Sequence, residues 1–339
     1  MSEGDNHLQL IGHESVLRFF EQSITLGRLC STYLLSGSAG IGKRVCARAI
    51  GQLILCKDRV GESACGQCSS CQAFQRQENP YFTERYFNQE KKSNESAVDV
   101  VRTFIDEIDS LSQVLHPVIV LIPNFQDYSI QVQNALLKTM EEPPSNIHIF
   151  LTSDRPHLVL ETILSRCQHI RMSPLRNDEL ESILKKLELP TSTLSSILHL
   201  CEGRVDMALK LSSPEYIEMK DFIEGIIQKP PVDFLQVADK ARSLTDQLKL
   251  GTKSEVKERD RVMEFVYVFE KIFIGRMINK VRDHFVAMQV LNACIEDIIS
   301  ARKALETSGH IFLSLDHYLN IATTRLMQMN KFSKTPEVS

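Results

Sequence analysis

The chain has 339 residues, of which 43% are hydrophobic and 24% are charged, and its formal net charge is −4. This balance is typical of a folded globular protein of two or three domains, and it excludes disordered and collagen-like chains. An acidic chain without Trp does not coat nucleic acid with bulk positive charge, so any DNA contact is local or shared with partners. No apolar run approaches the roughly 18 residues of a membrane span. The acidic N-terminus is unlike a signal peptide, so we expect a cytoplasmic protein without membrane contact.

Short apolar runs alternate with helical stretches up to about residue 173. Runs at Tyr33–Leu35, Val118–Ile122 and Ile147–Leu151 have the length and the continuous apolar character of buried strands. Because helical segments separate them, they predict a parallel sheet with helices on both faces. The first predicted domain is therefore an α/β domain over residues 1–173.

The rest of the chain carries helical signals. From Pro174 to about Ser213 the sequence predicts short helices with a break at Gly203, which gives a small second domain over 174–213. From Pro214 onward no segment has a strand pattern, so residues 214–339 are predicted to be all-α. Apolar residues there recur at helical spacing, as in Val262, Phe265, Val266, Phe269, Ile272 and Phe273. Pro230-Pro231 and Lys253–Arg261 are predicted to connect helices.

A glycine-rich turn, Gly37-Ser38-Ala39-Gly40-Ile41-Gly42-Lys43, follows the first predicted strand and precedes a helix. This is the context of a P-loop, in which Gly37, Gly40 and Gly42 let backbone N–H groups surround a phosphate and Lys43 reaches the outer phosphates. The alternative is a glycine-rich turn without nucleotide, which the pattern leaves open.

Two groups that phosphoryl transfer needs are missing. The residue after Lys43 is Arg44 in place of the Ser or Thr that holds magnesium. The strand at 118–122 ends in Pro123-Asn124 in place of a carboxylate pair, and Asn124 is no base at neutral pH. Asp127 is interpreted as a turn residue. We therefore expect a nucleotide-hydrolase fold that does not hydrolyse, with ATP or ADP binding left open and no magnesium.

Four cysteines form the pattern C-x8-C-x2-C-x2-C between residues 56 and 71. Closely spaced thiolates in a segment rich in Gly and Ser suit a tetrahedral zinc ion, so the pattern predicts one structural zinc site. Its ligands are Cys56, Cys65, Cys68 and Cys71. The alternative is a set of free thiols or a redox pair. The cysteines at 30, 46, 201 and 294 are interpreted as small core residues.

A third candidate is Arg166 in Leu164-Ser165-Arg166-Cys167. A lone arginine is usually a solvated surface residue, here paired with Glu161 for example.

The combination of these features resembles the AAA+ subunits of bacterial DNA polymerase III clamp loaders, closely over residues 9–215. The resemblance is carried by Ile11-Gly12-His13, the P-loop, the four-cysteine insertion, the run Asn134–Pro144 and the run Thr162–Cys167. The family implies an AAA+ domain with a zinc module at 56–71, a helical lid and a helical oligomerisation collar. It also implies that Arg166 is an arginine finger that acts in trans on the ATP of a neighbouring subunit.

The family divides into gamma/tau ATPases and the delta-prime type. The ATPases carry Lys-Thr in the P-loop, Asp-Glu after the second strand and an arginine in the lid, where this chain has Asp206. Arg204 lies two positions earlier, and we do not give it the sensor role. These departures favour the delta-prime type, which is no enzyme by itself but a part of the DNA polymerase III holoenzyme. The implied partners are the gamma/tau and delta subunits, the sliding clamp and, through the complex, primer-template DNA.

Two other functions stay open. One is a gamma/tau-type ATPase with an unusual site, and the other is a zinc-stabilised DNA-binding accessory protein. ATP hydrolysis that depends on Lys43 indicates the first, and salt-dependent DNA binding by the isolated chain indicates the second.

Overall fold

Two compact units make up the chain in the computed structural model. One contains residues 1–194 and 201–207, and the other contains residues 195–200 and 208–339. The structure describes residues 10–59, 61, 63–87, 97–111, 113–189, 191–228, 239–241, 243–244, 258–281, 285–307 and 310–332.

The first unit is built on one parallel sheet in the strand order β2–β3–β4–β1–β5. Its strands are β1 (Thr32–Ser36), β2 (Phe82–Glu84), β3 (Val118–Ile122), β4 (Ile147–Ser153) and β5 (Gln168–Arg171). The three central strands are buried along their whole length, as strands covered on both faces must be. The structure thus confirms the three predicted strands and adds the two edge strands.

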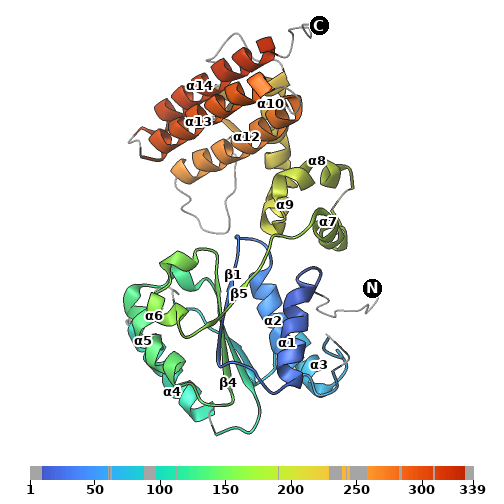
Figure 1. Ribbon diagram of the computed structural model, residues 1–339, viewed down its shortest axis with the longest axis vertical. Coiled ribbons are helices and arrows are strands. Elements are labelled where there is room, and N and C mark those ends of the chain that lie inside the picture. The colour runs from blue at the N-terminus through green and yellow to red at the C-terminus, as the bar shows by residue number, and fades with distance from the viewer. Residues whose placement is uncertain are drawn as a thin grey trace. The chain divides into compact units, whose positions relative to one another are not determined.

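Helices cover both faces of this sheet (Figure 1). On one face lie α1 (Glu14–Thr25), α2 (Lys43–Leu55) and α3 (Ser69–Gln75). On the other lie α4 (Ala97–Leu111), α5 (Ile130–Glu141) and α6 (Glu161–Leu164). Short 3-10 helices, η1 (Phe125–Asp127) and η2 (Pro156–Leu158), lead into α5 and α6. Each face buries its own apolar core, and each large side chain buried there contributes about 1.5–3 kcal/mol.

The parallel arrangement brings the carboxyl ends of the strands to one edge of the sheet. The register pairs Ser36 at the end of β1 with Ser153 at the end of β4, and Ile122 at the end of β3 with Leu151. Loops that leave these ends therefore meet, which is where open α/β sheets bind ligands. The P-loop leaves β1 at this edge.

Three short helices follow the sheet: α7 (Asn177–Lys186), α8 (Thr191–Cys201) and α9 (Val205–Leu211). The predicted break at Gly203 lies between α8 and α9. Gly203 has a φ of 73°, and a Cβ atom there would lie 2.3 Å from the carbonyl oxygen of Leu175. Only glycine fits this close approach of two backbone segments.

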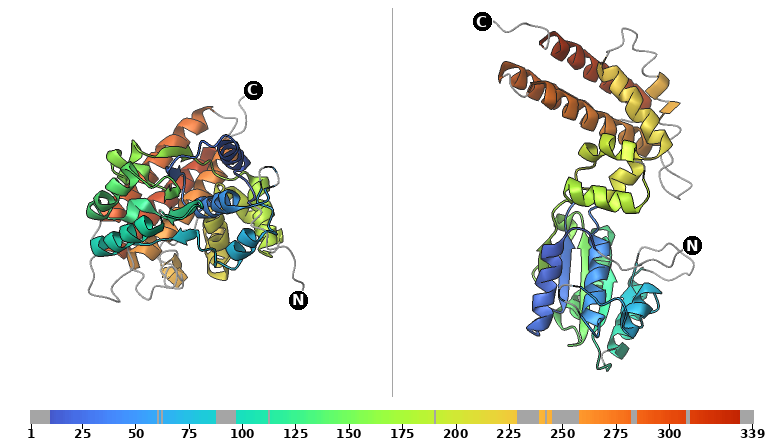
Figure 2. Two further views of the ribbon diagram at one scale, coloured as in Figure 1. Left: turned by 90° about the horizontal axis from the view of Figure 1, so that it is seen from below. Right: turned by 90° about the vertical axis from the view of Figure 1, so that its right-hand side faces the viewer.

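The described residues of the second unit are helical except at 212–213 and 310, and none of them forms a strand, as predicted. Its long helices are α10 (Pro214–Gln228), α12 (Glu258–Val281), α13 (Phe285–Thr307) and α14 (Ile311–Phe332). Figure 2 shows α13 and α14 as neighbouring long helices. Phe269 on α12 is fully buried and contacts the rings of Phe273 and Tyr318, so aromatic side chains join α12 to α14.

One predicted connection is partly wrong. Residues 258–261 belong to α12, because Glu and Arg are good helix formers and a run of charged residues does not interrupt a helix. Residues 253–257 and Pro230-Pro231 lie outside the described ranges. None of the helices in the described part of the chain combines the length and apolar content needed to cross a bilayer. The architecture is thus the predicted α/β region followed by an all-α region, and the domain boundaries at 173 and 213 stay predictions.

Candidate functional site

The P-loop connects β1 to α2, and its lysine is turned back onto the loop. Lys43 is the first residue of α2 and is only 7% exposed. Its Nζ donates hydrogen bonds to the carbonyl oxygens of Gly37, at 2.9 Å, and Ser38, at 2.7 Å. Burial lowers the pKa of Lys43, and the nearby carboxylates of Asp154 and Asp206 oppose this effect. The ammonium group is therefore satisfied by the chain itself.

Two other parts of the chain also bind P-loop carbonyl groups. The backbone N–H of Val205, at the start of α9, donates to the carbonyl of Gly40 at 2.9 Å. His13 Nε2 lies 2.9 Å from the carbonyl oxygen of Ile41, to which it donates when protonated. His13 belongs to the Ile11-Gly12-His13 motif, so the structure gives that motif a contact with the P-loop.

A carboxylate covers the middle of the loop. Gly40 has a φ of 72°, and a Cβ atom there would lie 1.5 Å from Oδ1 of Asp206. Arg204 holds this carboxylate through two hydrogen bonds, Nε to Oδ1 at 3.2 Å and Nη2 to Oδ2 at 2.8 Å. Asp206, which the resemblance places at the position of the lid arginine, thus brings a carboxylate to the P-loop, and the neighbouring Arg204 is paired with it.

Arg44 faces an acidic residue at the end of β2. Its Nη2 donates to Oε2 of Glu84 at 3.1 Å, and its Nε forms an ion pair with the same carboxylate. Nη1 of Arg48 lies 3.4 Å from Oε2 of Glu84, and the Tyr86 hydroxyl donates to Oε1 of Glu84 at 2.6 Å. Burial and this hydrogen bond raise the pKa of Tyr86 to about 12. Arg44, at the position where the sequence analysis expects a magnesium-binding hydroxyl in an active P-loop, is therefore part of an ion-pair network.

The loop that follows β3 contacts the neighbouring strand β4 through its backbone. Asn124 has a φ of 50°, and its N–H donates to Oγ1 of Thr152 at 3.0 Å. Asp127 pairs with Arg155 at 2.9 Å, in agreement with its interpretation as a turn residue. The sequence did not point to Asp154, whose carboxylate at the end of β4 interacts with Lys43. Its place directly after a buried strand is the signal that could have identified it.

The four predicted zinc ligands are brought together between α2 and α3. The sulfur atoms of Cys56, Cys65, Cys68 and Cys71 all lie within 4.8 Å of one another. A tetrahedron with zinc–sulfur bonds of about 2.3 Å has sulfur–sulfur edges of about 3.8 Å, so the cluster needs only a small contraction to hold zinc. The residues present therefore fit a structural zinc ion, which would cross-link the end of α2 to the start of α3.

Backbone groups already support negative charge on these sulfur atoms. The N–H groups of Cys65, Cys68 and Cys71 donate to the sulfur atoms of Cys56, Cys65 and Cys68 at 3.2, 3.3 and 3.5 Å. Burial opposes ionisation of Cys68, but hydrogen bonds from the N–H groups of Lys57 and Cys71 outweigh it and lower its pKa to about 6. Such N–H···S bonds orient metal-binding thiolates.

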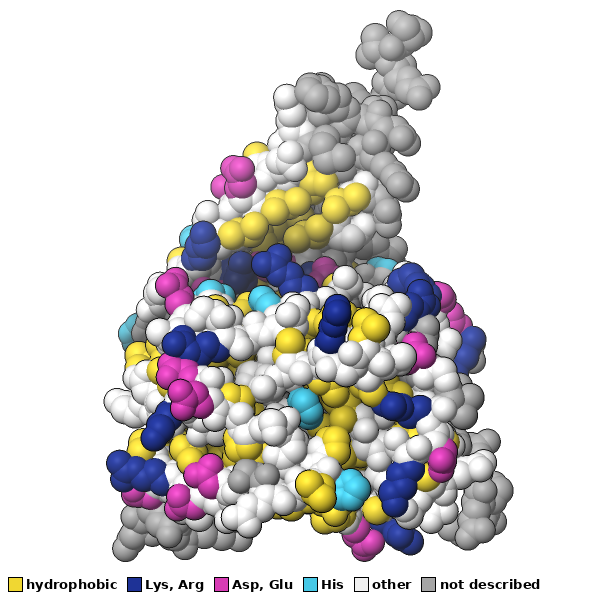
Figure 3. Space-filling model, turned by 60° about the horizontal axis from the view of Figure 1, so that its bottom comes forward, with side chains coloured by type: hydrophobic (Ala, Val, Ile, Leu, Met, Phe, Trp, Pro, Cys, Tyr) yellow, Lys and Arg dark blue, Asp and Glu magenta, His cyan; other side chains and the backbone are white. Residues whose placement is uncertain are grey.

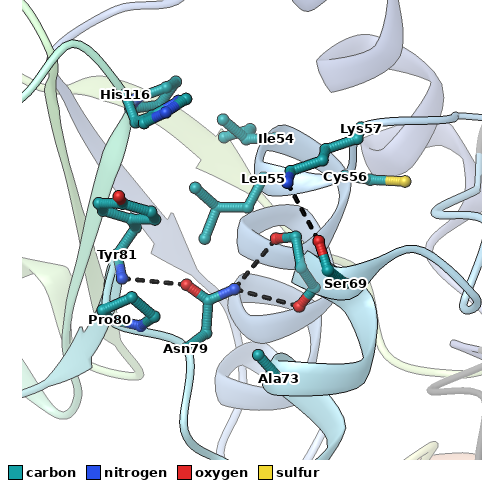
Figure 4. Close-up of a pocket in the computed structure, with 12 residues that line it drawn as sticks. Ile54, Leu55, Cys56, Lys57, Ser69, Ala73, Asn79, Pro80, Tyr81 and His116 are labelled. Carbon is teal, nitrogen blue, oxygen red and sulfur yellow. Dashed lines mark hydrogen bonds between the residues drawn. The ribbon is translucent and has the colours of Figure 1, made fainter.

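A cavity of about 370 Å³ lies beside this cluster (Figure 4). Asn79 lines this cavity, accepts a hydrogen bond from the N–H of Tyr81 and donates to the carbonyl and hydroxyl oxygens of Ser70. Nζ of Lys57 donates to the hydroxyl of Ser69. These polar groups are bonded to one another. Part of the cavity wall, including Cys56 and Ser69, therefore belongs to the segment that carries the four cysteines.

Of the other cysteines, Cys46, Cys201 and Cys294 are buried, as predicted. The prediction for Cys30 is wrong, because that residue is exposed. It lies in the turn before β1, where its N–H donates a hydrogen bond to the hydroxyl oxygen of buried Tyr33 at 2.6 Å. Apolar sequence neighbours therefore did not imply burial in that turn.

Arg166 lies between α6 and β5 and is partly exposed. Its Nη1 donates to the carbonyl of Thr162 at 2.8 Å, and its Nη2 lies 2.8 Å from Oε1 of Glu141. The suggested local pair with Glu161 is therefore replaced by an ion pair with the last residue of α5. The structure joins two motifs that the sequence analysis treated separately.

Gln133 on α5 is a site residue that the sequence analysis missed. It is 2% exposed, donates to the carbonyls of Tyr128 and Leu158, and accepts from the N–H of Leu160. It thereby fixes the segment that leads into α6 and Arg166. A polar residue within a helix whose neighbours are core residues is the signal that could have revealed it.

The surface shown in Figure 3 carries mixed charge. Lys and Arg side chains are interspersed with Asp and Glu, and no continuous basic field covers the described residues on that face. This agrees with the net charge of −4.

Residues 12–176 match the family model described as DNA polymerase III, delta subunit. The delta-prime subunit of Pseudomonas aeruginosa is 31% identical over 198 residues, which cover 57% of this chain and 60% of that protein. The gamma subunit of Buchnera aphidicola subsp. Schizaphis graminum is 27% identical over 179 residues, which cover 53% of this chain and 48% of that protein. The chain thus spans about half the length of the curated relatives it matches.

Among solved structures, a gamma subunit-related protein from Thermotoga maritima is similar, with a TM-score of 0.47 and 15% identity. The similarity covers 92% of this chain and 99% of that one. The family match and the sequence relatives point to the same set of proteins, the subunits of DNA polymerase III. Over residues 12–176, the chain is therefore similar to the delta, delta-prime and gamma subunits of DNA polymerase III.

Proposed function

We propose that this chain is a delta-prime-type subunit of the clamp loader that does not hydrolyse ATP. In this proposal it is a rigid member of a ring with gamma/tau and delta subunits in the cytoplasm, and it helps to load the sliding clamp on primed DNA. It donates Arg166 to the ATP site of a neighbouring subunit and holds one structural zinc ion.

The observation that carries the non-hydrolysing role is the state of the P-loop. Lys43 is bonded to two carbonyl groups of its own loop, and the carboxylate of Asp206 lies over Gly40. A phosphate there would meet a like charge in place of a lid arginine. Arg44, which cannot bind magnesium, is paired with Glu84. Each of these features opposes the binding of a magnesium–ATP complex or its hydrolysis.

The support for a role in trans is the position of Arg166. Its side chain is 39% exposed, and the residue follows a short helix whose Ile163 is fully buried in the core. An arginine on such a fixed base can enter a neighbour's site and stabilise charge on a transferring phosphoryl group.

The domain organisation that we propose follows this function. Residues 1–173 form the AAA+ domain with the zinc module at 56–71, residues 174–213 form the lid, and residues 214–339 form the oligomerisation collar. The helical character of the described residues beyond 214 supports a collar.

ATP hydrolysis by the isolated chain tests the proposal. We expect turnover at the background rate, and no change on Lys43→Ala. In a reconstituted complex with gamma/tau and delta subunits, we expect the same Lys43→Ala change in this chain to leave ATP turnover intact. Turnover by the isolated chain that Lys43→Ala abolishes would contradict the proposal.

That contrary result would favour the second candidate, a gamma/tau-type ATPase. Its support is that gamma and tau subunits are about as similar to this chain as delta-prime subunits are. The third candidate, a zinc-stabilised DNA-binding protein, requires salt-dependent DNA binding by the isolated chain, and the face shown in Figure 3 offers no continuous basic patch for it.

A further inference from the structure

We propose that Glu141 is the positioning residue for Arg166. This inference rests on the proposed function, because it specifies how the arginine finger is held before a neighbour's ATP arrives. The observation that carries it is the 2.8 Å ion pair between Nη2 of Arg166 and Oε1 of Glu141.

The backbone that carries Arg166 is held firmly. Ile163 is fully buried, and Cys167 packs against the same apolar core. The N–H of Arg166 donates to the carbonyl of Ile163 at 3.0 Å, which closes the turn after α6. The remaining freedom lies in the long side chain, whose Nη1 is held by the carbonyl of Thr162 at 2.8 Å. The same Nη1 also donates to the hydroxyl of Ser165 at 3.3 Å, so both of these bonds hold one nitrogen. The contact of Nη2 with Glu141 fixes the second nitrogen and with it the orientation of the guanidinium plane.

Glu141 is suited to this task because it ends a rigid helix. Ser129 caps the start of α5, and Val132, Leu136 and Met140 are buried in the core. Gln133 on the same helix is hydrogen-bonded to the segment that leads into α6. The helix therefore contacts the Arg166 segment near both of its ends.

Electrostatics also favour the pair. A carboxylate in the last turn of a helix lies near the negative end of the helix dipole, which makes a nearby cation favourable. The pair remains exchangeable, because the side chains of Arg166 and Glu141 are 39% and 41% exposed, and exposed ion pairs are weak. A phosphoryl group with greater negative charge can therefore replace Glu141 as a partner. The carboxylate of Glu141 therefore restricts the orientation of the Arg166 side chain but still allows it to leave for a neighbour's phosphate.

The expected effect is modest. An arginine loses rotamer freedom when it binds, and prior ordering removes part of that cost. Loss of Glu141 should therefore reduce the Arg166-dependent part of ATP turnover by about two- to tenfold. The ATP concentration at half-saturation should not change, because the neighbour's own P-loop binds the nucleotide.

The test uses the reconstituted complex with variants in this chain only. Arg166→Ala, Glu141→Ala, Glu141→Gln and the double variant Glu141→Ala/Arg166→Ala are compared for clamp- and DNA-stimulated ATP turnover. Glu142→Ala is the matched control, because Glu142 carries the same charge at the adjacent position and is also exposed. Equal thermal unfolding midpoints and equal incorporation into the complex check that each variant folds. If Glu141→Ala fails to assemble, Glu141→Gln decides, because it keeps the size of the side chain.

We expect both Glu141 variants to lower turnover at unchanged half-saturation, Glu142→Ala to match the unchanged chain, and the double variant to equal Arg166→Ala. If Arg166→Ala lowers turnover and neither Glu141 variant does, the positioning role of Glu141 is wrong, while the role of Arg166 in trans is retained. Increased turnover in the Glu141 variants would also overturn it, because Glu141 would then sequester the finger. A double variant worse than Arg166→Ala would show that Glu141 acts elsewhere. If Arg166→Ala has no effect, the proposed finger itself fails.

Discussion

The carboxylate of Asp206 lies over Gly40, so close that a Cβ atom on that glycine would come within 1.5 Å of Oδ1. The N–H of the preceding residue, Val205, donates to the Gly40 carbonyl at 2.9 Å. The start of α9 is therefore bonded to the P-loop through its backbone and covers it with a negative charge. Although Arg204 compensates part of this charge, we expect the arrangement to oppose the binding of a nucleotide phosphate.

Asp206→Ala should strengthen nucleotide binding. Two unit charges 4 Å apart in water repel by about 1 kcal/mol, which corresponds to about fivefold in affinity, and more where water is excluded. Titration with a fluorescent ATP analogue measures the change. Asp178→Ala is a suitable control, because Asp178 is an exposed carboxylate on α7 that pairs with Arg176. Equal affinity in the unchanged chain and the Asp206 variant would mean that this carboxylate does not oppose phosphate.

Arg44→Thr restores the hydroxyl of an active P-loop but should not restore ATP hydrolysis. The end of β3 still lacks a carboxylate, because Pro123 and Asn124 follow it. The change also removes the ion pair with Glu84, which should cost about 1 kcal/mol or less because the Arg44 side chain is half exposed. Thermal unfolding and an ATPase assay check the two expectations. Turnover above background in this variant would contradict the account of the missing groups.

Removal of zinc should unfold the cysteine module. We expect one zinc ion per chain, lost on treatment with a strong chelator or in Cys71→Ser, with a lower thermal unfolding midpoint. Cys30→Ser is the matched control, because Cys30 is exposed and lies outside the module. Metal analysis and thiol titration provide the readout. Protein purified without zinc, with four native thiols open to alkylation, would refute the site.

Phe269→Ala should destabilise the helical unit. The side chain is fully buried against Phe273 and Tyr318, and large-to-small changes of this kind cost about 3–5 kcal/mol. Ile278→Ala on the same helix is the control, because Ile278 is partly exposed. If residues 214–339 are the collar, Phe269→Ala should reduce binding to gamma/tau and delta subunits while zinc content stays at one per chain. Normal assembly by a variant with the expected loss of stability would argue against the collar.

The sequence predicted the three strands that are buried on both faces, because such strands consist of continuous apolar runs that can be recognised without knowledge of the tertiary contacts. It did not predict β2, since Phe82–Glu84 is three residues long and only partly buried at the edge of the sheet. The four-cysteine cluster was predictable because all its ligands lie within one short segment. The contacts between Arg166 and Glu141, and between Asp206 and Gly40, were not, because they depend on which helices and loops meet in the folded chain.

The most direct test of the central claim is ATP turnover by the reconstituted clamp loader with Arg166→Ala in this chain only. The account predicts that the variant folds, binds zinc and joins the complex, yet lowers clamp- and DNA-stimulated turnover and clamp loading. A single finger is worth about 10³–10⁵ in rate at its own site, but the total falls less because several sites share the work. Arg166→Lys should restore activity only in part, because it lacks the planar fork, and Arg102→Ala should have no effect. Unchanged turnover and unchanged loading with Arg166→Ala would contradict the role of this chain in trans.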